Sequence, residues 1–283
     1  MPEAYTFYRL ATAGWANRLL RDTVPLLEGK LSDGIILDLS SLEFVDTFGI
    51  TYLAACFHKV TSNVRGFVRP PRKREVNDYL LDVGLYEAIG IGDRFRPRKP
   101  SHDRVDLIHI NELEPLFIDH LLDFLEQMQP FEEGLRPSMR MALLELIQNF
   151  AEHSGSEVGA WVSGQFHPQR NRITLCVLDL GRGIPNALRT VSKYRRYRDT
   201  RLVELATEEG ITSVPETSRG LGLSTIKRFV RTNGGVLRLM TGEAQVTFPP
   251  DRRPEQKALE MPFPGTVAFL SLVPTKRGLF VLE

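Results

Sequence analysis

The sequence predicts two units of different fold class: an α/β unit in residues 1–95 and an α+β unit in residues 105–276. In the first unit, short apolar runs alternate with segments of helical periodicity, which predicts a sheet with parallel pairing covered by helices. In the second, several strands follow one another directly, which is typical of helices on one face of a mixed sheet. The basic, proline-containing stretch 96–104 is the expected linker, and residues 277–283 are the expected C-terminal tail.

The elements of the first unit follow from their apolar patterns. Residues 14–28 place Trp15, Leu19 and Val24 at helical spacing. The run Ile35-Ile36-Leu37-Asp38-Leu39 is typical of a buried strand. The expected strands are 5–10, 35–39 and 64–68, and the expected helices are 14–28, 50–60 and 75–85.

The second unit is expected to combine long helices with consecutive strands. Residues 113–129 have a broad apolar helical face, and Pro137 suits the first turn of the helix that follows. The expected helices are 113–129, 137–153, 202–209 and 223–232, and the expected strands are 105–110, 158–166, 172–178, 236–240, 244–248 and 266–272.

Composition narrows the class of protein. With 36 Lys and Arg against 35 Asp and Glu, the formal charge of +1 does not favour nucleic-acid binding through bulk charge. Cys56 and Cys176 lie in apolar runs and are expected to be buried thiols, with no ligand spacing for zinc. The sequence has neither a signal-peptide pattern nor an apolar run of the roughly 20 residues that span a bilayer. We therefore expect a soluble cytoplasmic protein with no membrane partner.

A polar stripe runs along the predicted helix 137–153. Glu145, Asn149 and His153 follow one another at intervals of four residues, so they share a face of a helix whose other side chains are largely apolar. Such a stripe either faces solvent or meets a polar ligand, because burial without a partner is costly. An Asn can give an oxygen to Mg²⁺, and a Glu can orient or deprotonate a nucleophile.

Glycine-containing turns follow two of the later elements. A strand runs directly into Asp179-Leu180-Gly181-Arg182-Gly183, where the glycines let backbone approach a ligand closely. A tight turn alone would also explain this pattern. Gly220-Leu221-Gly222 leads into a helix near Leu223, and backbone N–H groups at a helix start suit phosphate oxygens. This second turn matches neither the dinucleotide fingerprint nor the P-loop.

Taken in order, these segments resemble the boxes of the GHKL superfamily of ATP-binding domains, which includes gyrase, histidine kinases and anti-sigma-factor kinases. The resemblance covers about residues 105–276 and closes with Gly265-Thr266. It implies that Glu145 is the general base or polarises water, that Asn149 holds Mg²⁺, and that Asp179 binds the adenine amine. The residues that it places at ATP are Asn149, His153, Asp179, Gly181, Gly183, Arg219, Gly220, Leu221, Gly222, Leu223 and Thr266.

The resemblance also implies an ATP lid between Arg182 and Arg219. This segment is rich in arginine, and we expect residues 189–219 to have little core of their own and to order over the triphosphate. Arg219, beside Gly220, is the best phosphate candidate. A solvated basic helix would also explain most of the other cations.

The first unit resembles a STAS domain, the anti-anti-sigma fold. The resemblance rests on residues 35–50 and on Leu80-Leu-Asp-Val-Gly84-Leu85. That family carries a phosphorylated serine directly before a glycine, but here Phe48 precedes Gly49, and Thr47 is the nearest hydroxyl. We therefore expect this unit to be a docking module.

Together the resemblances imply a cytoplasmic regulator that binds Mg-ATP and acts as a slow ATPase or as a Ser/Thr kinase of the anti-sigma type. The implied partner is a protein, such as a sigma factor or a STAS-type regulator, and a homodimer stays open. The alternative is a non-catalytic switch in which ATP changes partner binding. A sensor histidine kinase and a gyrase-like DNA enzyme fit less well, because their additional helices and domains find no counterpart in the sequence.

Overall fold

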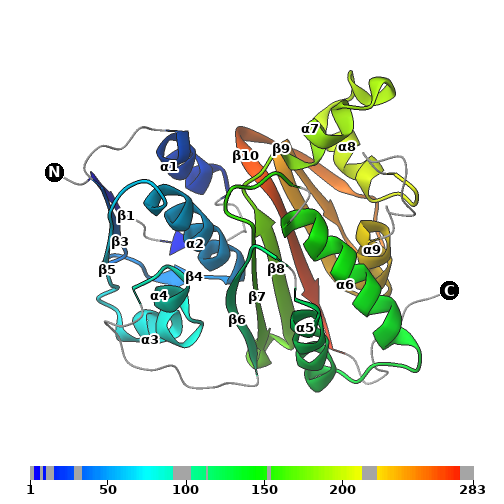
Figure 1. The fold of residues 1–283 in the computed structure, drawn as a ribbon. Helices are drawn as coiled ribbons and strands as arrows, with labels where there is room; N and C mark the ends of the chain where they lie inside the picture. Colours follow the sequence, from blue (N-terminus) through cyan, green and yellow to red (C-terminus); the bar gives the residue numbers. More distant parts are fainter. Residues whose placement is uncertain are drawn as a thin grey trace.

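The computed structural model describes residues 3–6, 9–10, 16–28, 34–91, 103–112, 114–151, 154–211 and 222–274. They form an N-terminal and a C-terminal unit side by side (Figure 1). The N-terminal unit has a parallel sheet in the order β1 (Glu3–Thr6), β3 (Ile35–Asp38), β5 (Gly66–Arg69). A second parallel pair joins β2 (Arg9–Leu10) to β4 (Phe44–Val45).

The described helices of the N-terminal unit are α1 (Ala16–Glu28), α2 (Thr47–Thr61), α3 (Arg74–Asp82) and α4 (Leu85–Ala88). The central one, α2, begins where the Asp46 carboxylate accepts a hydrogen bond of 2.8 Å from the backbone N–H of Gly49. Most of its residues are buried, so its stability comes from packing on more than one side.

The C-terminal unit is built on a five-stranded sheet in the order β6-β7-β8-β10-β9, with every described pair antiparallel. The strands are β6 (Arg104–Ile110), β7 (Ala160–His167), β8 (Arg172–Asp179), β9 (Val236–Phe248) and β10 (Glu255–Leu272). The mixed sheet that we expected is therefore wrong for the described strands, because none of the pairs among them is parallel.

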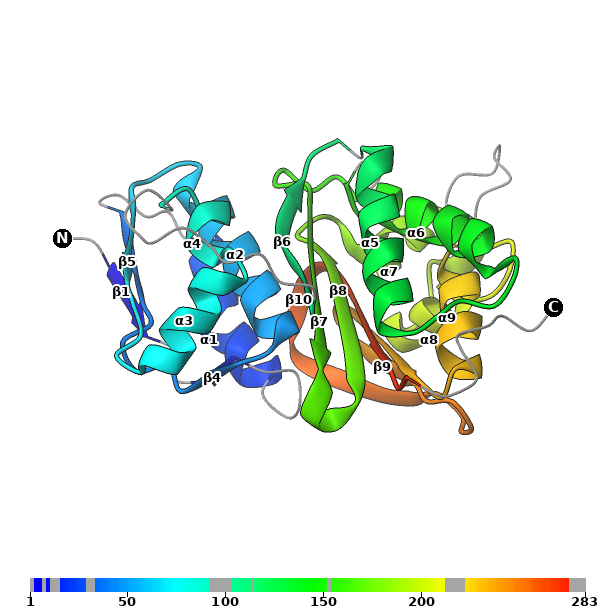
Figure 2. The ribbon, with the colours of Figure 1, turned by 90° about the horizontal axis from the view of Figure 1, so that it is seen from below.

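Helices α5 (Pro115–Met128), α6 (Leu135–Ala151) and α9 (Gly222–Thr232) cover one face of this sheet (Figure 2). Two shorter helices, α7 (Gly183–Arg189) and α8 (Asp199–Ala206), pack near β9. Arg140 of α6 bonds Asp119 of α5 at 3.1 Å, which ties the two long helices together. Short 3₁₀ turns occupy Pro168–Arg170 and Ser192–Tyr194.

The helix and strand predictions are confirmed for most elements, within a few residues at the ends. Two differ. The strands expected at 236–240 and 244–248 are one strand, β9, which passes through Gly242 at a positive φ of 54°. Strand β10 begins at Glu255 rather than Thr266. The prediction missed its first half because these residues are charged and exposed and show no apolar alternation. Helix α7 was not predicted.

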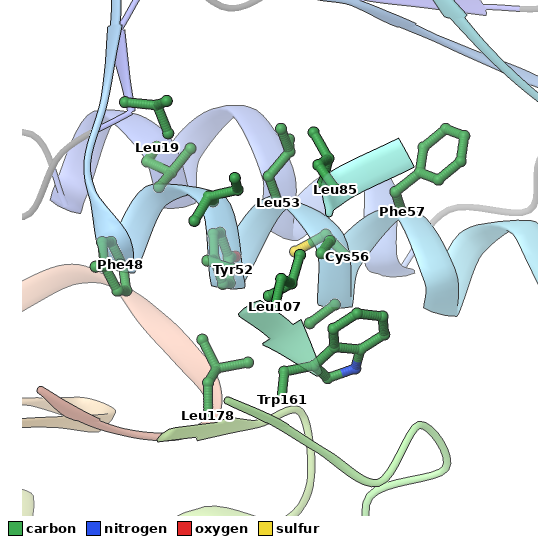
Figure 3. Packing of buried hydrophobic residues seen from close by; sticks show 14 of the residues in the cluster. Leu19, Phe48, Tyr52, Leu53, Cys56, Phe57, Leu85, Leu107, Trp161 and Leu178 are labelled. Carbon is green, nitrogen blue, oxygen red and sulfur yellow. The ribbon is translucent and has the colours of Figure 1, made fainter. Parts of the chain in front are cut away.

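The N-terminal unit covers the other face of the C-terminal sheet. One continuous core joins α2 side chains to Trp161, Cys176 and Leu178 of the C-terminal sheet. Figure 3 shows Trp161 and Leu178 beside the buried side chains of α2. Phe48 is 1 % exposed and stacks on Tyr52, whose ring lies 5.3 Å from that of Phe263 in β10. The second face is therefore buried within this chain.

Hydrogen bonds supplement this apolar interface. The hydroxyl of Thr47 bonds that of Thr174 at 2.9 Å, and the hydroxyl of Thr51 bonds that of Ser163 at 2.7 Å. The backbone N–H of Leu107 in β6 also donates to the carbonyl of Val83 at 2.9 Å. Because these groups are buried, pairing across the interface avoids the cost of unsatisfied polar atoms.

Both cysteines lie in the same interface, as free and buried thiols. Burial raises the pKa of Cys56 to about 12 and also raises that of Cys176. The expectation of buried thiols is thus confirmed. Among the described residues, no helix is both long and apolar enough to cross a membrane.

Phe48→Ala should destabilise the two units together. Truncating a buried Phe lowers the free energy of unfolding by about 3–5 kcal/mol, because apolar burial is lost and a cavity is left behind. Because one core spans both units, we expect a single urea transition at a lower midpoint, with far-UV circular dichroism and tryptophan fluorescence coinciding. Phe67→Ala, at an exposed ring on β5, is the matched control and should change the midpoint little. Two separate transitions in the wild-type protein would contradict the shared core.

Candidate active site

A row of polar side chains crosses the end of the C-terminal sheet, on the face covered by α5, α6 and α9. Asp179, the last residue of β8, lies opposite Thr266 of β10, which lies opposite Thr241 of β9. Their neighbours two residues away, Val177 and Ala268 among them, belong to the core under α5 and α6. The three side chains are nearly inaccessible, at 2 %, 4 % and 0 % exposure.

Asp179 is a buried carboxylate with unusual electrostatics. Desolvation raises its pKa from 3.8 to about 7, although backbone N–H groups of Gly181 and Thr266 oppose the shift. The Gly181 N–H donates to Oδ1 at 2.7 Å. Within the described residues no cation pairs with this carboxylate. A ligand group that donates a hydrogen bond here would therefore relieve a desolvation cost.

The turn after Asp179 lies against the segment that follows α6. The backbone N–H of Arg182 donates to the Ser154 carbonyl at 2.9 Å. A Cβ at Gly181 would lie 2.4 Å from that same carbonyl oxygen, so only glycine fits this approach. The predicted turn thus brings the end of β8 close to the end of α6. Gly183 is the first residue of α7.

Two residues that the sequence analysis did not single out shape this turn. The Thr241 hydroxyl donates to the Gly265 carbonyl at 2.7 Å and accepts from the Ile184 N–H at 3.0 Å. It thereby joins the start of α7 to β10. The signal for Thr241 was its place as a polar residue ending the apolar run 236–240. Ser154 contributes through its backbone, which sequence patterns do not reveal.

Gly265 is a further residue of this turn, and its backbone conformation requires glycine. Its φ is 110°, a region open to glycine, and a Cβ there would lie 2.2 Å from the Asp179 carbonyl. Gly265 thus allows β10 to approach the end of β8 and places Thr266 directly beside Asp179.

Helix α6 carries Glu145 and Asn149, both half-buried. A Cβ at Gly222, the first residue of α9, would lie 3.1 Å from the Cβ of Glu145. The start of α9 therefore touches the predicted general base. Leu223, also half-buried, packs against the core beneath α9. The structure thus brings Glu145 of the polar stripe beside Gly222, the described residue of the second glycine turn.

Four predicted ATP-site residues lie outside the described residues: His153, Arg219, Gly220 and Leu221. Their proposed roles remain predictions.

The segment between the two glycine motifs corrects one expectation. Residues 189–211 do not lack a core of their own, because Leu188, Tyr194, Leu202 and Leu205 form a small buried cluster. Arg189 pairs with Asp199, whose other oxygen accepts from the backbone N–H of Glu243 at 2.8 Å. The expected lid is thus partly a folded extension of the sheet edge. Residues 212–221 lie outside the description.

The arrangement offers a buried hydrogen-bond acceptor, an amide oxygen and a carboxylate on connected elements. In the described part of the chain, no three His, Cys, Asp or Glu side chains are grouped to hold a metal ion. Asn149 could contribute one oxygen to Mg²⁺, an ion that usually keeps waters and ligand phosphates as its other ligands. The donor set therefore fits a metal bound with a nucleotide better than a metal held by protein alone.

Comparison with known families supports this interpretation. Residues 134–263 match the model of the histidine kinase-, DNA gyrase B- and HSP90-like ATPase family, HATPase_c. This segment is therefore similar to the HATPase_c domains. The match begins just before α6 and includes Glu145, Asn149, Asp179 and both glycine motifs, and it ends three residues before Thr266. The resemblance inferred from the motifs is confirmed for this segment.

A solved structure is similar to part of the chain as well. The topoisomerase IV ATP-binding domain of Francisella tularensis, solved with a small-molecule inhibitor, aligns at 12 % identity and a TM-score of 0.28. The alignment covers 65 % of this chain and 45 % of that one, so this chain spans less than half of that structure. No curated protein matches the sequence.

Asp179→Asn should stabilise the ligand-free protein most at high pH. Because the folded-state pKa of Asp179 lies above 3.8, its stabilising contribution is fully present below that value and is lost as pH rises through about 7. Asn keeps the oxygen facing Gly181 and carries no charge. The gain in unfolding free energy should be about 2 kcal/mol larger near pH 8 than near pH 5, measured by urea titration.

Asp251→Asn, at an exposed carboxylate, is the control for this comparison. An Asp179→Asn gain that does not change between the two pH values would show that Asp179 is not held at a raised pKa.

Proposed function

We propose that the protein is an Mg-ATP-binding regulator that acts as a slow ATPase or as a Ser/Thr protein kinase on a protein partner. The observation that carries this proposal is the buried Asp179 carboxylate at the end of β8, within the HATPase_c segment and beside Thr266. The family match supports ATP binding. The finer statements below rest on the position of each residue.

Adenine suits the environment of Asp179. Its exocyclic amine is a hydrogen-bond donor, and the carboxylate is a buried acceptor with no cation beside it in the described residues. Guanine presents a carbonyl oxygen at the corresponding ring position, which would face the carboxylate without a proton between them. Thr266 lies next to Asp179 and can complete the contact through its hydroxyl.

Asn149 and Glu145 would act at the phosphate end. Bound Mg-ATP supplies the transferable phosphoryl group. Asn149 would give an amide oxygen to the metal, one turn of α6 away from Glu145. Glu145 would take the proton from an attacking water or from a Ser or Thr hydroxyl of the partner. The start of α9 at Gly222 lies against Glu145 and offers backbone N–H groups toward phosphate.

The alternative is a nucleotide switch without turnover. The side chain of Glu145 lies against α9, so it can also serve packing between the two helices. In that case ATP would change the contacts of the chain without phosphate transfer. Retention or loss of turnover in a Glu145 variant separates the two functions.

We further propose that the N-terminal unit is STAS-like and that the whole chain is of the anti-sigma kinase type, acting on a sigma-factor-like or STAS-type partner in the cytoplasm. The place of the family's phosphoserine is Phe48, which is buried in the interface with the C-terminal unit. The neighbouring Thr47 hydroxyl is 2 % exposed and bonded to Thr174. These contacts support a docking role without phosphorylation at this place.

Calorimetry with Mg-ATP and Mg-GTP tests the adenine assignment. We expect ATP to bind and GTP to bind much more weakly. Asp179→Asn should weaken ATP binding about tenfold to a hundredfold, because an amine left against a poorer partner costs about 1–3 kcal/mol. Equal affinity for both nucleotides, or unchanged ATP affinity in the variant, would remove Asp179 from the adenine site.

Glu145→Gln should keep nucleotide affinity and lose turnover. The substitution preserves the stem that contacts α9 but removes the base, and a general base contributes about a hundredfold or more to rate. Phosphate release and phosphotransfer to added protein are measured beside calorimetry. Glu133→Gln, at an exposed residue just before α6, is the control. Loss of binding together with turnover would make Glu145 structural and favour the switch.

A further inference from the structure

The connection between α7 and α8 carries cations that the proposed chemistry does not use. Five of the nine residues 193–201 are Lys or Arg, and this stretch projects beyond the end of the sheet (Figure 1). We name Lys193, Arg195, Arg196 and Arg198 the basic tip. All four are exposed.

The charges of the basic tip lack carboxylate partners among the described residues. The acidic groups nearby are already engaged elsewhere. Asp199 pairs with Arg189, and Glu204 and Glu208 pair with Arg201. Lys193 lies 4.7 Å from the ring centre of Tyr194, and no carboxylate is within ion-pair distance of it or of the three arginines in this part of the chain.

The basic tip rests on a rigid support. Tyr194 is 6 % exposed and belongs to the small cluster with Leu188, Leu202 and Leu205. Asp199 links this support both to α7 and to the backbone of β9. The backbone that carries the cations is thus supported before a partner binds, so binding would have to order the side chains but not the chain itself.

We propose that the basic tip is a docking surface for an acidic segment of a partner protein. Arg guanidinium groups bind carboxylates through two parallel hydrogen bonds. Tyr197, 44 % exposed between Arg196 and Arg198, adds an aromatic contact, and Arg and Tyr are both enriched in protein interfaces. This inference goes beyond the proposed function and does not depend on nucleotide binding.

A nucleic acid fits the basic tip less well. Proteins that hold duplex DNA through its backbone commonly use about 6–10 phosphate contacts, and the tip offers four cations. The formal charge of the whole chain, +1, adds no general attraction. A nucleic-acid partner is therefore an alternative outcome of the test.

The test uses the full chain and the variant R195Q/R196Q/R198Q. The control R252Q/R253Q/K257Q removes the same charge from exposed residues around the β9–β10 connection. Binding of a fluorescein-labelled oligo-glutamate peptide is followed by anisotropy at low salt, and binding of an oligonucleotide of equal charge is followed in parallel. Far-UV circular dichroism confirms that both variants fold, and calorimetry gives their Mg-ATP affinity.

The tip variant should lose about tenfold in peptide affinity, because each exposed ion pair contributes a factor of about two and three are removed. The control should bind the peptide like wild type, and Mg-ATP affinity should stay unchanged in both. Equal peptide binding by both variants would overturn the proposal. So would tip-dependent binding that is tighter for the oligonucleotide, or a tip variant that loses Mg-ATP and keeps the peptide. Wild type and both variants could fail to bind Mg-ATP while only the tip variant loses peptide affinity. In that case the nucleotide proposal fails and the docking surface stands.

Discussion

The C-terminal sheet is apolar on both of its faces, so both faces need cover. In β8, successive residues such as Val177 and Leu178 point to opposite sides and are both fully buried. Helices α5, α6 and α9 cover one side, and α2 of the N-terminal unit, with α1 against β10, covers the other. Antiparallel sheets commonly leave one face to solvent, whereas here hydrophobic burial binds the two units into one body.

The same sheet supports a costly group at its end. Asp179 is buried without a cation in the described residues, next to residues that fix its position from three sides. Gly181 approaches Ser154, Gly265 approaches the Asp179 carbonyl, and Thr241 links α7 to β10. A rigid sheet end can keep a carboxylate buried although hydration would favour its exposure to water. Groups held in this way cluster at functional sites.

How far the sequence predicts this molecule depends on the kind of signal. Periodicity located most helices and strands, and motif order located the HATPase_c segment, because both are properties of neighbouring residues. The packing of α2 on the sheet was not predicted. The apolar residues of helix 47–61 show that it is buried but do not indicate which surface it packs against. The contribution of Ser154 escaped for a similar reason, because it acts through a carbonyl that every residue possesses. The cluster around Tyr194 was obscured by the arginines between its apolar residues.

The two buried thiols make the interface between the units chemically observable. Cys56 lies on α2 and Cys176 on β8, and both have the raised pKa of desolvated thiols. A thiol in this state reacts with an alkylating reagent only after water and reagent reach it. When closing is faster than alkylation, the labelling rate at these sites follows the population of separated units. Alkylation of Cys56 and Cys176 therefore reports how often the two units separate. Mass spectrometry can follow each cysteine in the unmodified sequence.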